Sequence, residues 1–198
     1  MIEFRNGDRH GSVRVEYNAP LTYATKLGDP AIVNALLRAG ANPNYANVMG
    51  WTALMAAVNT GAVSCAIALI KAGADLELSQ PLAGRCTPLI LAACQRSPRM
   101  IPILLRAGAR LDMTRFDSIL EKLAAQRARH PPWRTANLRA NLTYIRRIDA
   151  AGGWKKYECR HRKQLTTTFA RVVFPRLPIE AISNIVCFWA HVGFYAVA

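Results

Sequence analysis

The chain has 198 residues, 52% of them hydrophobic, with a formal net charge of +14. This composition excludes an intrinsically disordered chain, because it contains enough apolar residues to form a buried core. Residues 1–113 hold 11 basic and 7 acidic residues, net +4, whereas residues 114–198 hold 15 and 5, net +10. A basic half is most often a solvated surface, but it also suits an acidic partner, nucleic acid or an anionic membrane surface.

The N-terminal residues and the cysteines indicate an intracellular protein, in the cytoplasm or the nucleus. Residues 1–18 form a separate segment and carry charges where a secretory signal needs an apolar run. Val13, Val15 and Tyr17 alternate there, which predicts the finger or edge of a truncated first unit. The five cysteines are scattered and lack paired spacing, which favours reduced thiols over a disulfide framework.

Between residues 19 and 113 the sequence repeats itself three times. The copies span 19–44, 47–77 and 82–112 and end in "ALLRAGANPN", "ALIKAGADLE" and "ILLRAGARLD". Their glycines (Gly40, Gly73 and Gly108) are 33 and then 35 residues apart. Leu21, Leu54 and Leu89, in a second shared string upstream, keep the same spacing. Two strings in one register predict a repeat architecture in which each unit buries its apolar face only by stacking on its neighbours.

Each copy predicts two helices followed by an extended linker. In the second copy Thr52 caps a helix over 53–60, Gly61 interrupts the chain, and Gly73 ends a second helix over 63–72. The second helix opens at Asp29-Pro30 in the first copy and at Ser97-Pro98 in the third. Because Pro102 falls about five residues into that third helix, we expect a kink or a late start there.

These copies resemble the ankyrin-repeat family, whose unit of about 33 residues carries T-P-L-H-x-A at its first helix. "TPLILAA" (87–93) and "GWTALMAA" (50–57) match that motif, and Gly-Ala follows each second helix. The motif histidine is replaced by Thr22, Met55 and Ile90. The resemblance implies an all-α helix–turn–helix solenoid with short β-hairpin finger loops and a helical C-terminal cap.

The resemblance also implies a concave protein-binding surface made of fingers and first helices. Carried over by register, its residues are Lys26, Val48, Met49, Trp51, Asn59, Thr60, Arg85 and Gln95. Met49 and Trp51 suit an interface because exposed large apolar side chains often mark one, and Trp is a common hot spot. Trp51 equally suits a structural role in covering the neighbouring finger.

Residues 114–153 predict a degenerate fourth helix pair. Ile119, Leu120 and Leu123 form one stripe, and Leu138, Leu142, Ile145 and Ile148 form a second. "HPPW" (130–133) between them predicts a loop, and "DAAGG" (149–153) echoes the glycine stop of the repeats.

Residues 154–173 predict a basic amphipathic helix. Trp154, Tyr157, Leu165, Phe169 and Val172 form its apolar side. The first interpretation is a terminal cap, because repeat arrays need a terminal unit with a polar outer face. The alternative is an acidic partner or nucleic acid, bound by Lys155, Lys156, Arg160, Arg162 and Lys163.

The remainder, 176–198, predicts a last helix rather than a membrane span, because Ser183, Asn184 and His191 interrupt its apolar run. Pro178 suits its first turn and Glu180 its positive end. Ile182, Ile185, Val186 and Trp189 form a stripe suited to sealing the last repeat. The segment also resembles the opening of an F-box-like sequence, and this resemblance implies ligase docking through Leu177, Pro178, Glu180 and Ile185.

No catalytic motif, cofactor-binding motif or metal-ligand spacing occurs in the sequence. We therefore expect a non-enzymatic, monomeric protein without a cofactor. The first hypothesis is a protein-interaction module, the second a ubiquitin-ligase adaptor acting through the tail, and the third a nucleic-acid binder acting through the basic helix.

Overall fold

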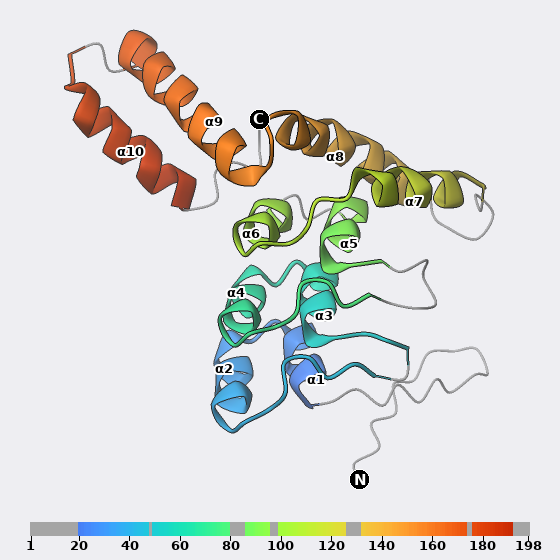
Figure 1. The fold of residues 1–198 in the computed structure, drawn as a ribbon. Coiled ribbons are helices and arrows are strands. Elements are labelled where there is room, and N and C mark those ends of the chain that lie inside the picture. Colours follow the sequence, from blue (N-terminus) through green and yellow to red (C-terminus); the bar gives the residue numbers. More distant parts are fainter. Residues whose placement is uncertain are drawn as a thin grey trace.

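The computed structural model of the chain is a stack of antiparallel helix pairs, and it describes residues 20–47, 49–79, 86–95, 99–125, 132–173 and 176–191 (Figure 1). The first unit holds α1 (Pro20–Leu27) and α2 (Pro30–Arg38), and the second holds α3 (Ala53–Thr60) and α4 (Val63–Lys71). The third holds α5 (Pro88–Cys94) and α6 (Met100–Arg106). First helices α1, α3 and α5 stack in one row, and second helices α2, α4 and α6 in another.

Local signals in the sequence set where the helices of the repeats begin. The hydroxyl of Thr52 accepts the N–H of Met55 at 3.3 Å, and the carboxylate of Asp29 accepts the N–H of Ala31 at 2.8 Å. Each side chain satisfies a donor that the first turn of a helix leaves without a partner. The predicted N-caps at both positions are confirmed.

The helix ends in the repeats follow the predicted glycines. Gly61 ends α3 with a φ of 73°, and Gly73 follows α4 with a φ of 83°. This left-handed conformation favours glycine, which has no Cβ to clash with the preceding carbonyl.

The third unit begins its second helix late, as Pro102 led us to expect. Helix α6 starts at Met100, so Pro102 lies in its first turn, where a missing N–H breaks no helical hydrogen bond. The Ser97-Pro98 cap lies outside the described residues.

The core of the repeats consists of small and branched apolar side chains in register. Leu21, Leu54 and Leu89 are buried, as are the corresponding Ala24, Ala57 and Ala92. The alanines allow neighbouring helices to approach closely. Thr22, Met55 and Ile90, at the motif histidine position, are also buried, so two of these three positions add apolar packing to the core.

Two further helices extend the rows, and they are not the two expected. Helix α7 (Met113–Ala125) packs against α8 (Pro132–Ala150), but it is α8 that packs on α5 and α9 (Trp154–Thr168) that packs on α6. The side-chain amide of Asn141 donates to the carbonyl of Ala93 at 2.8 Å and so joins α8 to α5. Helices α8 and α9 therefore continue the two rows, and α7 comes before them as an addition (Figure 1).

The apolar stripe of α8 is confirmed: Leu138, Leu142, Ile145 and Ile148 are all buried. The predicted 130–133 loop is wrong at its end, because α8 already begins at Pro132, a residue suited to a first turn. Gly152 and Gly153, both with positive φ, form the turn between α8 and α9 rather than the end of a unit.

Helix α9 is shorter than predicted and ends in a wider turn. A π-helical segment, η1 (Phe169–Val173), follows it and changes the angular spacing of the side chains. For this reason Val172 does not join the apolar side of the helix and is 69% exposed.

The last helix, α10 (Ile179–His191), begins directly after Pro178, whose carbonyl accepts the N–H of Ile182 at 3.2 Å. Ile182 and Val186 are buried, but α10 packs mainly against α9 and η1 and not against the third repeat. The helical cap therefore covers α9, the outermost helix of its row (Figure 1). The side chain of Trp189 and residues 1–19 lie outside the description.

Ala46 and Thr52 form an antiparallel bridge, and within the described ranges no longer strand occurs. The second finger is thus closed by a single bridge rather than by an extended β-hairpin. None of the helices in the described ranges has the length and apolarity needed to cross a bilayer.

Candidate protein-binding surface

The candidate surface, here called the finger face, comprises the second finger and the C-terminal ends of the first helices. Its residues within the described ranges are Lys26, Met49, Trp51, Asn59, Thr60 and Gln95. The finger joins the N-terminal end of α3, whereas Asn59 and Thr60 end that helix. An eight-residue helix is about 12 Å long, so the candidates form two groups at opposite edges of the face.

Asn47 organises the second finger, a role that the sequence interpretation missed. Its buried carboxamide oxygen accepts the N–H of Met49 at 3.0 Å and the N–H of Trp51 at 2.9 Å. Its backbone N–H donates to the carbonyl of Trp51 at 3.0 Å. The string "NVMG" carried the signal, because an Asn that bonds the backbone two residues ahead is a standard turn former.

Met49 and Trp51 differ in exposure although both belong to this finger. Met49 is 38% exposed, whereas Trp51 is half-buried and packs against the core. Tyr45, at the start of the finger, is 47% exposed and was not predicted as a site residue. Val48 lies outside the described residues, as does Arg85 on the third finger.

The opposite edge of the finger face, at the C-terminal ends of the first helices, is polar, and some of its side chains form hydrogen bonds within the chain. Gln95 is buried, and its amide donates to the carboxamide oxygen of Asn59 at 2.7 Å, which joins the third unit to the second. The hydroxyl of Thr60 donates to the carbonyl of Ala56 at 3.0 Å. Lys26 is exposed at the end of α1. Lys26, Asn59 and Thr60 are thus placed for contact, whereas Gln95 positions Asn59.

The five basic candidates of α9 do not form one cluster. Lys156, Arg160 and Lys163 are exposed and spaced four and three, so they share one solvent-facing stripe. Lys155 is exposed on another side. Arg162 is half-buried, and its guanidinium lies 3.6 Å from the sulfur of Cys187 on α10.

The inner side of α9 is held to the array by rings and one ion pair. Tyr157 stacks on His161 with ring centroids 5.7 Å apart, and Tyr144 of α8 meets Tyr157 edge-on. Burial lowers the pKa of His161 and raises that of Tyr157. The guanidinium of Arg106 on α6 lies 2.6 Å from the carboxylate of Glu158 and 5.6 Å from the ring centre of Trp154.

The candidate docking residues of the tail lie mostly on the surface. Leu177 is 43% exposed, Pro178 and Glu180 are exposed, and Ile185 is half-buried. Ile179, between them, is 57% exposed.

Comparison with known proteins connects this architecture to a family. Residues 21–117 match the family model for ankyrin repeats, in three copies. E3 ubiquitin-protein ligase XBAT32 of Arabidopsis thaliana is 41% identical over 88 residues, which are 44% of this chain and 17% of that protein. B-cell lymphoma 3 protein homolog of Mus musculus is 32% identical over 109 residues, 53% of this chain and 23% of that protein.

A third relative has an enzyme's name. Glycerophosphocholine phosphodiesterase GDE1 of Eremothecium gossypii is 35% identical over 100 residues, 48% of this chain and 8% of that protein. The chain spans less than a quarter of the length of each of these relatives. The family match, the 33- and 35-residue spacing and the stacked helix pairs show that residues 21–117 of this chain are three ankyrin repeats.

Proposed function

We propose that the chain is a non-enzymatic interaction module that binds a protein partner through its finger face. The observation that carries the proposal is the second finger, where Met49 is 38% exposed on a backbone fixed by Asn47. A finger whose backbone is already ordered in the free protein loses less conformational entropy when a partner covers it. Ankyrin repeats in general mediate protein–protein interaction, which agrees with this proposal.

The two edges of the finger face suit different parts of one interface. Tyr45 and Met49 offer aromatic and apolar contact area on the finger, and such residues often dominate binding energies. Lys26, Asn59 and Thr60 offer charge and hydrogen bonds at the other edge, where a polar rim is typical. A partner that spans the first helices would contact both edges at once.

The test uses the full chain as bait, followed by measurement of the affinity of the captured partner. Met49→Ala is expected to weaken binding about tenfold, since truncating a hot-spot residue costs more than about 1 kcal/mol. Ile67→Ala is the matched control, because Ile67 is also 38% exposed but lies on α4, in the second row. Equal affinities of the two variants for the partner would contradict the proposal.

A second candidate function, substrate adaptor of a ubiquitin ligase, is favoured by the surface of α10. Leu177 and Ile179 are exposed beside Glu180 at the start of a helix that packs mainly on α9 and η1. One relative carries the name of an E3 ubiquitin-protein ligase. In this proposal the finger face holds the substrate and the start of α10 contacts the ligase core.

Co-purification of a ligase core with the full chain tests this second function. Leu177→Asp combined with Ile179→Asp is expected to abolish the association, because it places charge in an apolar contact. Met49→Ala should leave ligase association unchanged while it weakens substrate capture. Absence of any ligase component from the wild-type purification would remove the adaptor function and leave the interaction module in place.

A further inference from the structure

Helix α7 takes the position in the sequence that a finger holds in the earlier units. Asn44 and Glu77 occupy the same position in their repeats, four residues after Gly40 and Gly73. In the sequence, a finger segment follows each of them and leads to the next first helix, at Thr52 and at Thr87 respectively. Asp112 is the third member of this register, but α7 begins at the very next residue. The row of first helices resumes only with α8. The third linker therefore leads directly into a helix instead of into a fourth finger.

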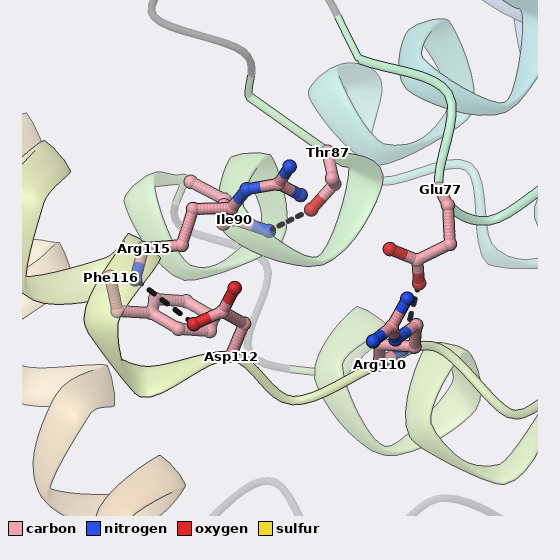
Figure 2. Close-up of a pocket in the computed structure, with 7 residues that line it drawn as sticks. All are labelled: Glu77, Thr87, Ile90, Arg110, Asp112, Arg115 and Phe116. Carbon is pink, nitrogen blue, oxygen red and sulfur yellow. Dashed lines mark hydrogen bonds between the residues drawn. The ribbon is translucent and has the colours of Figure 1, made fainter.

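A cavity of about 210 Å³ lies at this change from finger to helix (Figure 2). Ile90 and Phe116, both buried, form its apolar part. Its other described lining residues are polar or charged: Glu77, Thr87, Arg110, Asp112 and Arg115. They come from the second linker, the start of α5, the third linker and the first turn of α7, so three successive units contribute to the cavity.

Both carboxylates of the cavity already accept hydrogen bonds from the chain. Glu77 accepts the backbone N–H of Arg110 at 2.8 Å. Asp112 accepts the hydroxyl of Thr114 at 2.6 Å and the backbone N–H of Arg115 at 3.2 Å. These bonds lower the pKa of Asp112. The two acidic side chains thus act as caps for the linker and the helix.

The two guanidinium groups take no part in these hydrogen bonds, although the charge of Arg115 also helps to lower the pKa of Asp112. Within the described part of the chain, neither Arg110 nor Arg115 forms an ion pair, although Figure 2 shows both side chains at the cavity. Each guanidinium carries five N–H donors and no acceptor. The hydroxyl of Thr87 accepts the N–H of Ile90 at 3.5 Å and keeps its own proton to donate. The two capping carboxylates form no ion pair with these guanidinium groups, so their N–H donors remain available, and a carboxylate from another molecule matches the fork of a guanidinium.

The volume and the surrounding charge narrow the choice of ligand. Pockets for whole small molecules measure roughly 300–1,000 Å³, so this cavity suits a single side chain better than a cofactor. The lining holds two arginines and two carboxylates, and the whole chain has a formal net charge of +14, a field that attracts negative charge. We propose that the cavity receives one acidic side chain of the partner, with Arg110 and Arg115 as its ligands; this rests on the proposed function of the finger face.

The test is an NMR titration of the full chain with two short peptides, acetyl-Gly-Glu-Gly-amide and acetyl-Gly-Gln-Gly-amide. The glutamate peptide is expected to shift the Nε–Hε signals of Arg110 and Arg115 saturably, with half-maximal effect on the order of millimolar. The amides of Ile90 and Phe116 should shift with them. The glutamine peptide, which has the same shape without the charge, should produce less than about a fifth of these shifts.

Variants and one further probe make the result decisive. Combined Arg110→Gln and Arg115→Gln should abolish the shifts of the Ile90 and Phe116 amides, whereas Arg139→Gln on the exposed side of α8 should preserve them. Equal shifts with both peptides, no shift with glutamate, or shifts that persist in the double variant would overturn the proposal. Inorganic phosphate acting at a tenfold lower concentration than the glutamate peptide would also overturn it, because the cavity would then be an oxyanion site.

The failure of this site and the failure of the proposed function can be told apart. If the glutamate peptide has no effect while Met49→Ala still weakens partner binding, the acid site is wrong and the finger face stands. If the peptide binds at the two arginines but Met49→Ala matches Ile67→Ala, the finger face is wrong. If both are right, the double arginine variant binds the partner at least about fivefold more weakly than wild type.

Discussion

Asn44, at the end of the first repeat, is hydrogen-bonded to Asp75, near the end of the second repeat. The carboxamide oxygen of Asn44 accepts the backbone N–H of Asp75 at 2.7 Å. Its amide nitrogen also donates to the carbonyl of Gly73 at 3.2 Å. Glu77 repeats this contact one unit later by accepting the N–H of Arg110 at 2.8 Å. One register position therefore ties each linker to the next. The third member, Asp112, instead caps α7.

Replacing Asn44 is expected to weaken the contact between the first and second repeats. Asn44→Ala removes both inter-repeat bonds, and because the site is exposed, water replaces part of the loss, leaving about 1 kcal/mol. Urea unfolding of variants that retain Trp51 as the single tryptophan, followed by fluorescence, measures the change. Asn34→Ala, exposed on α2, is the control and should be neutral or stabilising, because Ala is the better helix former. Equal effects of the two variants would contradict the role of Asn44.

The N-cap of α3 provides a second stability test. Thr52→Ala removes the acceptor of the Met55 N–H at a buried helix start and should lower the free energy of unfolding by about 1 kcal/mol. Thr52→Ser keeps the hydroxyl and should retain most of that stability. If Ser is as destabilising as Ala, the methyl group and not the cap explains the loss.

The ion pair between Arg106 and Glu158 should control how firmly α9 is held on α6. Its side chains are 29% and 18% exposed, so solvent screens the pair only in part. Glu158→Gln is expected to cost about 1 kcal/mol, which speeds hydrogen exchange of the α9 amides about fivefold and leaves those of α3 unchanged. The same substitution at Glu180, exposed on α10, should affect neither set.

His161 should make the packing of α9 sensitive to acid. Its pKa is lowered from 6.5 by burial, so the unfolded chain binds this proton more readily than the folded chain. The contribution of neutral His161 is therefore complete above pH 6.5 and is lost as the pH falls from there through the lower folded pKa. His161→Phe keeps a ring against Tyr157 but cannot titrate.

The comparison between wild type and His161→Phe isolates this effect from the other histidines. Unfolding free energies measured at pH 7.5 and pH 5 should fall more for wild type than for the variant. Identical pH dependence of the two proteins would show that the stacked imidazole does not titrate in this range.

The solvent-facing stripe of α9 tests the role of the basic surface. Combined substitution of Lys156, Arg160 and Lys163 by Gln should change the free energy of unfolding by no more than about 0.5 kcal/mol per site, because all three are exposed. If wild type binds nucleic acid with an affinity that falls steeply with salt and the triple variant does not, this stripe is a nucleic-acid site instead of a solvated face.

The repeats could be predicted from the sequence because their signals are local. Thr52, Gly61 and Gly73 each act within a few residues of their own position, so the helix limits followed from the string itself. The stripe of Ile182 and Val186 predicted that α10 buries one face, and this is confirmed. A periodic stripe does not specify which surface covers it. The predicted neighbour of α10 was the last repeat, whereas the helix packs mainly on α9 and η1.

The sequence likewise predicted where the residues of the candidate surface lie along the repeats, but not which neighbours they contact. Register placed Met49 on an exposed finger, but it could not show that Asn47 draws the Trp51 backbone inward or that Gln95 is covered. The change at α7 did leave a sequence signal. Three residues separate Ala109 from Met113, whereas ten separate Ala41 from Thr52, which leaves no room for a finger.

The packing of α10 also affects how the chain comes apart. Its main contacts are with α9 and η1, and α9 in turn meets the array through α6 and α8. When contacts join only neighbours, a stack can lose its end unit while the rest remains folded. Heating should therefore release α10 first and then α9, with α3 and α5 among the last to melt. Variants that retain only Trp154 or only Trp51 would then give two melting temperatures by fluorescence, the lower one from Trp154.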